Sequence, residues 1–120
     1  MPDRILIRDL RARTVIGVED DERSDAQEVL VNVVLEVDTR QAAASDDIAD
    51  TVNYATVAKE IMALAAAARF HLVEALAGEI ARICLAHRGV LAAVVRVDKP
   101  GAVRQARSVG VEIRRAREDV

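Results

Sequence analysis

The chain has 120 residues, 52% of them hydrophobic, and a formal net charge of −3 at pH 7. This length predicts one domain, residues 1–120, with an aliphatic core, because aromatic residues make up only 2% of the chain. Scattered Arg residues exclude a nucleic-acid-binding surface, short apolar segments exclude a membrane span, and a single Cys excludes an internal disulfide. The N-terminus lacks the pattern of a signal peptide, so we expect a soluble cytoplasmic protein.

The first half of the chain predicts two strands separated by a polar turn. Over residues 4–16, Ile5 and Ile7 alternate loosely with charged residues, which is typical of a strand. Residues 17–26 are polar and predict a turn region. Residues 28–37 alternate strictly and are rich in β-branched side chains, which predicts a strand with one buried face. The residues on that face are Val29, Val31, Val33, Leu35 and Val37.

The second half predicts two helices followed by two strands. Residues 40–53 are polar and predict a loop that could hold a short turn, and Asn53 at its end is suited to cap a helix. Apolar residues then recur twice at helical spacing, and Gly89 closes the second helix. The predicted segments are helices at about 54–68 and 71–87 and strands at 90–98 and 109–114.

The predicted order, β-β-α-α-β-β, belongs to the α+β class. Its two hairpin-like halves predict an antiparallel four-stranded sheet with both helices on one face. An open sheet of four strands leaves two edges, and long Val-rich edges invite aggregation unless another subunit pairs with them. The strands therefore favour, without requiring, an oligomer joined edge to edge.

Lys99 needs a chemical explanation. The chain contains fifteen Arg and only two Lys, yet it places a Lys between Asp98 and Pro100 at the end of a strand. Arg stays protonated at working pH, whereas a Lys amine can exchange its proton when neighbouring groups tune it. Pro100 also restricts the Lys99 backbone, which suits a positioned base. The pattern leaves two interpretations open: a proton-transfer residue or a surface lysine.

Three further residues could bind a ligand, although each also has a purely structural interpretation. Glu74 lies in the first turn of the second helix, where the helix dipole stabilises a carboxylate and paired N–H donors could reach it. Glu22 belongs to an acidic run that could simply be solvated, and Tyr54, the only Tyr, could be packing. His71 and His87 lack metal-ligand spacing. We recognise no catalytic triad, phosphate loop or metal site, and we expect neither a metal nor a cofactor.

Five segments occur in one order with matching gaps and together span roughly residues 3–115. They are IGVEDDERSDAQ, SDDIADTVNYA, FHLVEALAGEIA, VDKPGAV and SVGVEI. This set resembles the dihydroneopterin aldolase family of folate biosynthesis. The resemblance implies the tunnelling fold, in which four subunits pair their sheet edges into a ring barrel and two rings commonly stack. It also implies a homo-oligomer, a tetramer or an octamer, with a pterin substrate bound between adjacent subunits.

The resemblance implies a role for each candidate residue. Lys99 matches the lysine that acts as general acid and base, and Glu74 matches the carboxylate that binds the 2-amino and ring N–H edge of the pterin, beside the Val73 backbone. Tyr54 matches the catalytic and substrate-binding tyrosine supplied across the interface, and Glu22 matches the substrate-binding glutamate at the side-chain end of the substrate. The implied reaction is retro-aldol cleavage of 7,8-dihydroneopterin, in which a C=N bond of the pterin accepts the electrons and no metal is needed.

Two alternatives to an aldolase stay open. Dihydroneopterin triphosphate 2′-epimerase is similar to the aldolase, and LRARTVIGV, VNYATVAKEI and ARF resemble it, whereas KPGAV resembles the aldolase more. Both enzymes would break and remake the same bond, so 2′-epimerisation could accompany cleavage. The second alternative is a non-catalytic small-molecule-binding module. Its ferredoxin-like order, β-α-β-β-α-β, differs from the order predicted here.

Overall fold

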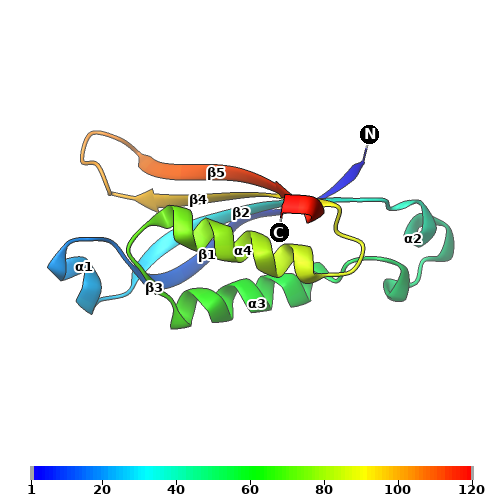
Figure 1. The fold of residues 1–120 in the computed structure, drawn as a ribbon, viewed down its shortest axis with the longest axis horizontal. Coiled ribbons are helices and arrows are strands. Elements are labelled where there is room, and N and C mark those ends of the chain that lie inside the picture. Colours follow the sequence, from blue (N-terminus) through cyan, green and yellow to red (C-terminus); the bar gives the residue numbers. More distant parts are fainter. Residues whose placement is uncertain (1, 120) are drawn as a thin grey trace.

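The computed structural model describes residues 2–119. Its four long strands form one twisted sheet, and two helices of 14 residues each lie along it (Figure 1). The elements are β1 (Asp3–Ile16), α1 (Asp20–Ser24), β2 (Gln27–Val37), α2 (Arg40–Ser45), the 3-10 turn η1 (Ile48–Asp50), α3 (Tyr54–Ala67), β3 (Arg69–Phe70), α4 (Val73–Ala86), β4 (Ala92–Pro100), β5 (Ser108–Ala116) and the 3-10 turn η2 (Arg117–Asp119).

The sheet has five strands in the order β3-β1-β2-β4-β5. The four long strands pair antiparallel, as predicted. The prediction of a purely antiparallel four-stranded sheet is wrong in one respect, because β3 adds a short parallel strand beside Val15 and Ile16 of β1. The strand β3 has only two residues, which is too short for any alternation in the sequence to reveal it.

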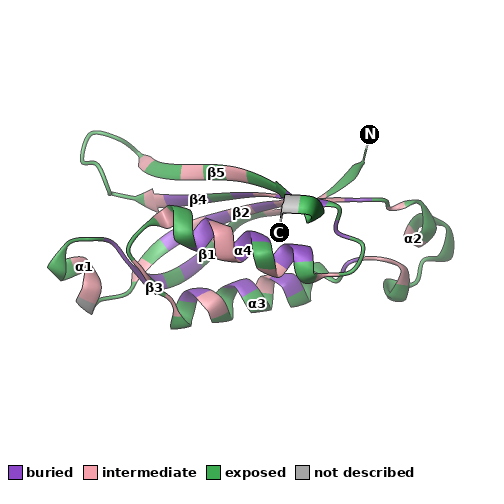
Figure 2. Ribbon diagram, in the orientation of Figure 1, coloured by how far each residue is buried: buried purple, intermediate pink, exposed green. Residues whose placement is uncertain are grey.

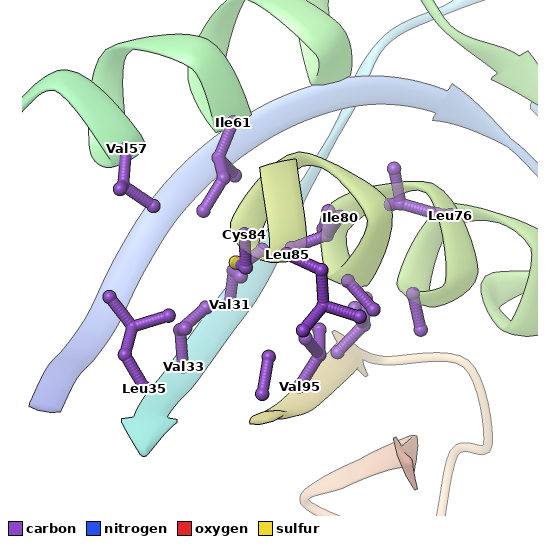
Figure 3. Close-up of a cluster of buried hydrophobic side chains, with 14 of the residues drawn as sticks. Val31, Val33, Leu35, Val57, Ile61, Leu76, Ile80, Cys84, Leu85 and Val95 are labelled. Carbon is purple, nitrogen blue, oxygen red and sulfur yellow. The ribbon is translucent and has the colours of Figure 1, made fainter. Parts of the chain in front are cut away.

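The helices α3 and α4 cover one face of the sheet, and the core lies between them and the strands. Buried residues line the helix sides that face the sheet (Figure 2). Apolar side chains of β2, β4 and both helices meet there (Figure 3). Burying an aliphatic side chain of this size contributes about 1.5–3 kcal/mol, so this layer supplies the main stabilisation of the fold. The labelled residues are Val31, Val33, Leu35, Val57, Ile61, Leu76, Ile80, Cys84, Leu85 and Val95.

Two segments predicted as polar connections contain short helices. The helix α1 has five residues and α2 has six. Neither is long enough to show an apolar stripe in the sequence, so hydrophobic periodicity could not predict them. The predicted N-cap of α3 is confirmed, because Asn53 Oδ1 accepts hydrogen bonds from Ala55 N at 3.1 Å and Thr56 N at 3.3 Å.

The strand β1 contains a bulge, at which Arg8 and Asp9 together lie opposite the single residue Asn32 of β2. The Asp9 backbone has a φ of 53°, and its N–H donates to Asn32 Oδ1 at 2.8 Å. Asn32 Nδ2 in turn donates to Asp9 Oδ1 at 3.2 Å. The extra residue explains the loose alternation of this strand. Core-facing positions are odd-numbered before the bulge (Ile5, Ile7) and even-numbered after it (Leu10, Ala12).

Candidate active site

Lys99 forms an ion pair with Glu22. It is the penultimate residue of β4 and follows Val97 on the face that the helices cover. Its ammonium group contacts Glu22 Oε2, and the two side chains are 13% and 23% exposed. The contact joins residues 77 positions apart and brings a proton donor and a proton acceptor together. The hydrogen bond from Lys99 is the main reason that the pKa of the Glu22 carboxyl lies below its usual value.

Gly17 makes room for the Glu22 side chain. The φ of Gly17 is +137°, and a Cβ at this position would lie only 2.7 Å from Glu22 Cβ. A side chain here would therefore strain the backbone and also displace the carboxylate. Glu22 Oε1 accepts a further hydrogen bond from Glu19 N at 3.3 Å, which holds the carboxylate against the start of α1.

Asp98 precedes Lys99 in the chain but does not pair with it. Its side chain lies on the opposite face of the sheet, where Arg96 Nε donates to Asp98 Oδ2 at 2.8 Å. Gly110 lies opposite Asp98 on β5, and a Cβ there would come within 3.0 Å of Asp98 Cγ. The carboxylate of Asp98 is thus engaged elsewhere, and the carboxylate that contacts Lys99 comes from Glu22.

Glu74 and Val73 lie at the start of α4. Glu74 is exposed and occupies the first turn, while Val73 is half-buried. The N-cap residue of α4 is Leu72, whose side chain provides no capping hydrogen bond. Leu72 therefore gives the first backbone N–H groups of α4 no side-chain cap. The carboxylate of Glu74, in the same turn, can accept hydrogen bonds. The start of α4, the helix α1 and the end of β4 all lie toward the same end of the molecule (Figure 1).

Tyr54 lies away from these residues. It is the first residue of α3, and α3 begins toward the other end of a molecule that is 51 Å long and 25 Å wide (Figure 1). Its side chain is 61% exposed. The structure therefore places Lys99, Glu22, Val73 and Glu74 toward one end of the molecule and does not bring Tyr54 to them.

Three other findings concern two buried side chains and the predictions about a metal site and a membrane span. Thr14 is 2% exposed, and its hydroxyl has no hydrogen-bond partner among the described residues. Cys84 is buried in the core, and burial raises the pKa of its thiol to about 12, which agrees with the predicted packing role. Within residues 2–119, no cluster of His, Cys, Asp and Glu could hold a metal ion, and no helix is long and apolar enough to cross a membrane.

Two residues beside Glu22 were not predicted from the sequence. They are Gly17 and Arg23, whose guanidinium donates to the backbone carbonyl groups of Gly17, Arg69 and Phe70. Glycine can mark a positive φ or a close approach to the backbone, but no pattern in the sequence links Gly17 to Glu22. Arg23 carried no signal either. It is one of fifteen Arg residues in the chain, and its three acceptors are backbone carbonyl groups that no sequence motif identifies.

The chain matches the family model described as dihydroneopterin aldolase over residues 5–114. It is 49% identical over 100 residues to a dihydroneopterin aldolase of Streptomyces coelicolor, covering 83% of this chain and 84% of that protein. It is 37% identical over 109 residues to the dihydroneopterin triphosphate 2′-epimerase of Escherichia coli, covering 91% of each. The crystal structure of E. coli dihydroneopterin aldolase in complex with neopterin superimposes with a TM-score of 0.91 at 38% identity, covering 95% of this chain and 99% of that one.

Proposed function

The chain belongs to the dihydroneopterin aldolase family, and on that premise we propose that it cleaves 7,8-dihydroneopterin. The products are 6-hydroxymethyl-7,8-dihydropterin and glycolaldehyde. The observation that carries this proposal is the ion pair between Lys99 and Glu22, which provides a proton donor and an acceptor in contact at one end of the molecule. We also propose a cytoplasmic location for the enzyme.

The reaction is a retro-aldol cleavage. A base removes the proton from the hydroxyl on C2′ of the side chain, and the C1′–C2′ bond breaks. The electron pair of that bond moves into the adjacent C=N bond of the pterin ring, and a proton then returns to C1′. Because the substrate accepts its own electrons, the protein has to supply placed proton carriers and a firm grip on the ring.

Lys99 and Glu22 serve the side-chain end of the substrate in this proposal. Lys99 carries the proton, and Glu22 accepts a hydrogen bond from the side-chain hydroxyl. Glu74 binds the 2-amino and ring N–H groups through its two carboxylate oxygens, beside the Val73 backbone. The common location of these residues toward one end of the molecule supports the assignment.

We further propose that the site is completed by a second subunit, which contributes Tyr54. Two features support this assembly. The outer edge of β1 is covered by β3 only at Val15 and Ile16, and β5 forms the other edge of the sheet. Pairing such edges between subunits satisfies their backbone groups and generates a ring, as a tetramer or a stacked octamer.

A specific observation favours one alternative activity, since the chain is also 37% identical to the E. coli epimerase. Incubation with 7,8-dihydroneopterin and with its triphosphate, side by side, separates the two functions. We expect hydroxymethyl-dihydropterin and glycolaldehyde from the first substrate, with some 2′-epimer. Formation of the 2′-epimer alone would assign the chain to the epimerase, and recovery of both compounds unchanged would indicate a non-catalytic pterin-binding module.

A further inference from the structure

The guanidinium of Arg23 binds three backbone carbonyl groups. Arg23 Nη2 donates to Arg69 O at 2.8 Å, and Nη1 donates to Phe70 O at 3.0 Å and, more weakly, to Gly17 O at 3.5 Å. A guanidinium carries five N–H donors in a rigid plane, so it can hold several acceptors in one fixed arrangement.

These acceptors belong to two segments that are far apart in the sequence. Gly17 lies between β1 and α1, and Arg69 and Phe70 form β3, which leads directly into α4. Gly17 N also donates to Phe70 O at 3.3 Å, so the two segments are joined by the backbone as well as by Arg23. The first segment continues into Glu22, and the second continues into Glu74.

We propose that Arg23 is a positioning residue, which sets the spacing between the Lys99–Glu22 ion pair and Glu74. This inference rests on the proposed function, because the spacing matters only if these groups bind one substrate. The helix α1 has five residues and cannot hold its own position, since isolated helices of that length are unstable in water. Arg23 follows Glu22 directly and ties α1 to the segment that begins α4.

Arg117 provides a matched control. Its Nη2 donates to His87 O at 3.1 Å and to Val90 O at 2.6 Å, which is the same kind of contact. These acceptors lie just after the end of α4, whereas the proposed site lies at its start. Replacing either arginine with lysine keeps the charge but removes the planar set of donors.

The test compares Arg23→Lys, Arg23→Gln and Arg117→Lys with the wild type by kcat and KM for dihydroneopterin, affinity for unsubstituted pterin, and Tm. We expect both Arg23 variants to lose about 10- to 100-fold in kcat, because small misplacements of reacting groups are costly. Their affinity for pterin, which has the ring but no side chain, should stay within about twofold of wild type, because α4 still holds Glu74. Arg117→Lys should lower Tm but leave kcat unchanged. If the Arg23 variants lose Tm as Arg117→Lys does but keep their kcat, Arg23 is merely structural and the proposal is overturned.

A double-mutant cycle shows whether Arg23 acts through Glu22. In a Glu22→Gln background, Arg23→Lys should cause little further loss of kcat, because the group that it positions is already disabled. A fully multiplicative loss would overturn the proposal while leaving the proposed function intact. If Glu22→Gln and Lys99→Ala both retain wild-type turnover, the roles proposed for the ion pair fail, and the role of Arg23 fails with them. If the wild type does not cleave dihydroneopterin, the proposed function itself fails.

Discussion

The two ends of the molecule present their candidate residues differently. At one end, Lys99 and Glu22 form an ion pair with side chains only 13% and 23% exposed, and Arg23 ties the surrounding segments together. At the other end, Tyr54 is 61% exposed at the start of α3. The charged pair is thus formed within one chain, whereas the exposed aromatic side chain leaves apolar surface that a partner could bury.

Removing Lys99 tests the charged end and should have the largest effect. Lys99→Ala should lower kcat by roughly 10²- to 10⁴-fold, the usual contribution of a positioned acid or base, with a smaller change in substrate affinity. Lys99→Arg keeps the charge but cannot release its proton at working pH. Steady-state kinetics on both variants distinguish the roles, and an Arg variant with wild-type kcat would contradict proton transfer by Lys99.

Changing Glu74 tests whether the end of the molecule that holds Lys99 also binds the pterin ring. Glu74→Gln replaces one acceptor oxygen with an NH₂ group that would face the N–H groups of the pterin. The loss of a charged hydrogen bond and the unpaired donors should cost on the order of 2–4 kcal/mol of pterin binding. Calorimetry with pterin measures this loss, and circular dichroism checks that the fold survives. Unchanged affinity would rule out Glu74 as the anchor.

Mixing two inactive variants tests whether the ends meet across an interface. Lys99→Ala keeps Tyr54, and Tyr54→Ala keeps Lys99, so a site built from one of each is intact. Random mixing in a ring should restore about one quarter of the sites. The measurement is turnover after the two variants are unfolded and refolded together, with each refolded alone as the control. A mixture no more active than its components would show that Tyr54 and Lys99 do not share a site.

The smallest expected effect is the loss of folding stability at low pH, when the Glu22 carboxylate that pairs with Lys99 is protonated. The pKa of Glu22 is lowered from 4.5 by its hydrogen bond with Lys99, so the ionised carboxylate stabilises the folded state above pH 4.5. That contribution is lost as the pH falls through the lowered pKa. Glu22→Gln should therefore lower the free energy of unfolding at pH 7, by less than about 1 kcal/mol, and by less at pH 3. Urea titrations of the wild type and of Glu22→Gln at both values of pH measure this difference. An equal effect of Glu22→Gln at both values of pH would contradict this account.

The sequence predicted best the helices and strands in which buried residues recur at one constant spacing. The strict alternation of β2 gave its buried face correctly, from Val29 to Val37, because no irregularity interrupts that strand. It predicted β1 less well, since the bulge at Arg8 and Asp9 reverses the alternation within the strand. The two residues of β3 follow no period at all, so only the folded chain reveals them.

The candidate site was less predictable than the fold. Lys99, Glu22, Glu74 and Tyr54 could be selected only as a set, through their family resemblance, because each has an ordinary structural explanation by itself. The contact between Lys99 and Glu22 spans 77 residues, and no local pattern encodes a contact of that separation. The contacts of Arg23 could not be predicted for a related reason. Its partners are backbone carbonyl groups, which every residue possesses.

The bulge in β1 also restricts which strands can join the sheet from outside. The bulge at Arg8 and Asp9 increases the local twist of β1 and places one extra residue in the strand. A flat strand that approached the outer edge of β1 could not continue its hydrogen-bond ladder past this point. A strand from an unfolded or foreign chain would lose its pairing there, whereas a neighbour shaped to the twist would keep it. The extra residue that lets β1 contribute both odd and even positions to the core thus also opposes open-ended growth into fibres.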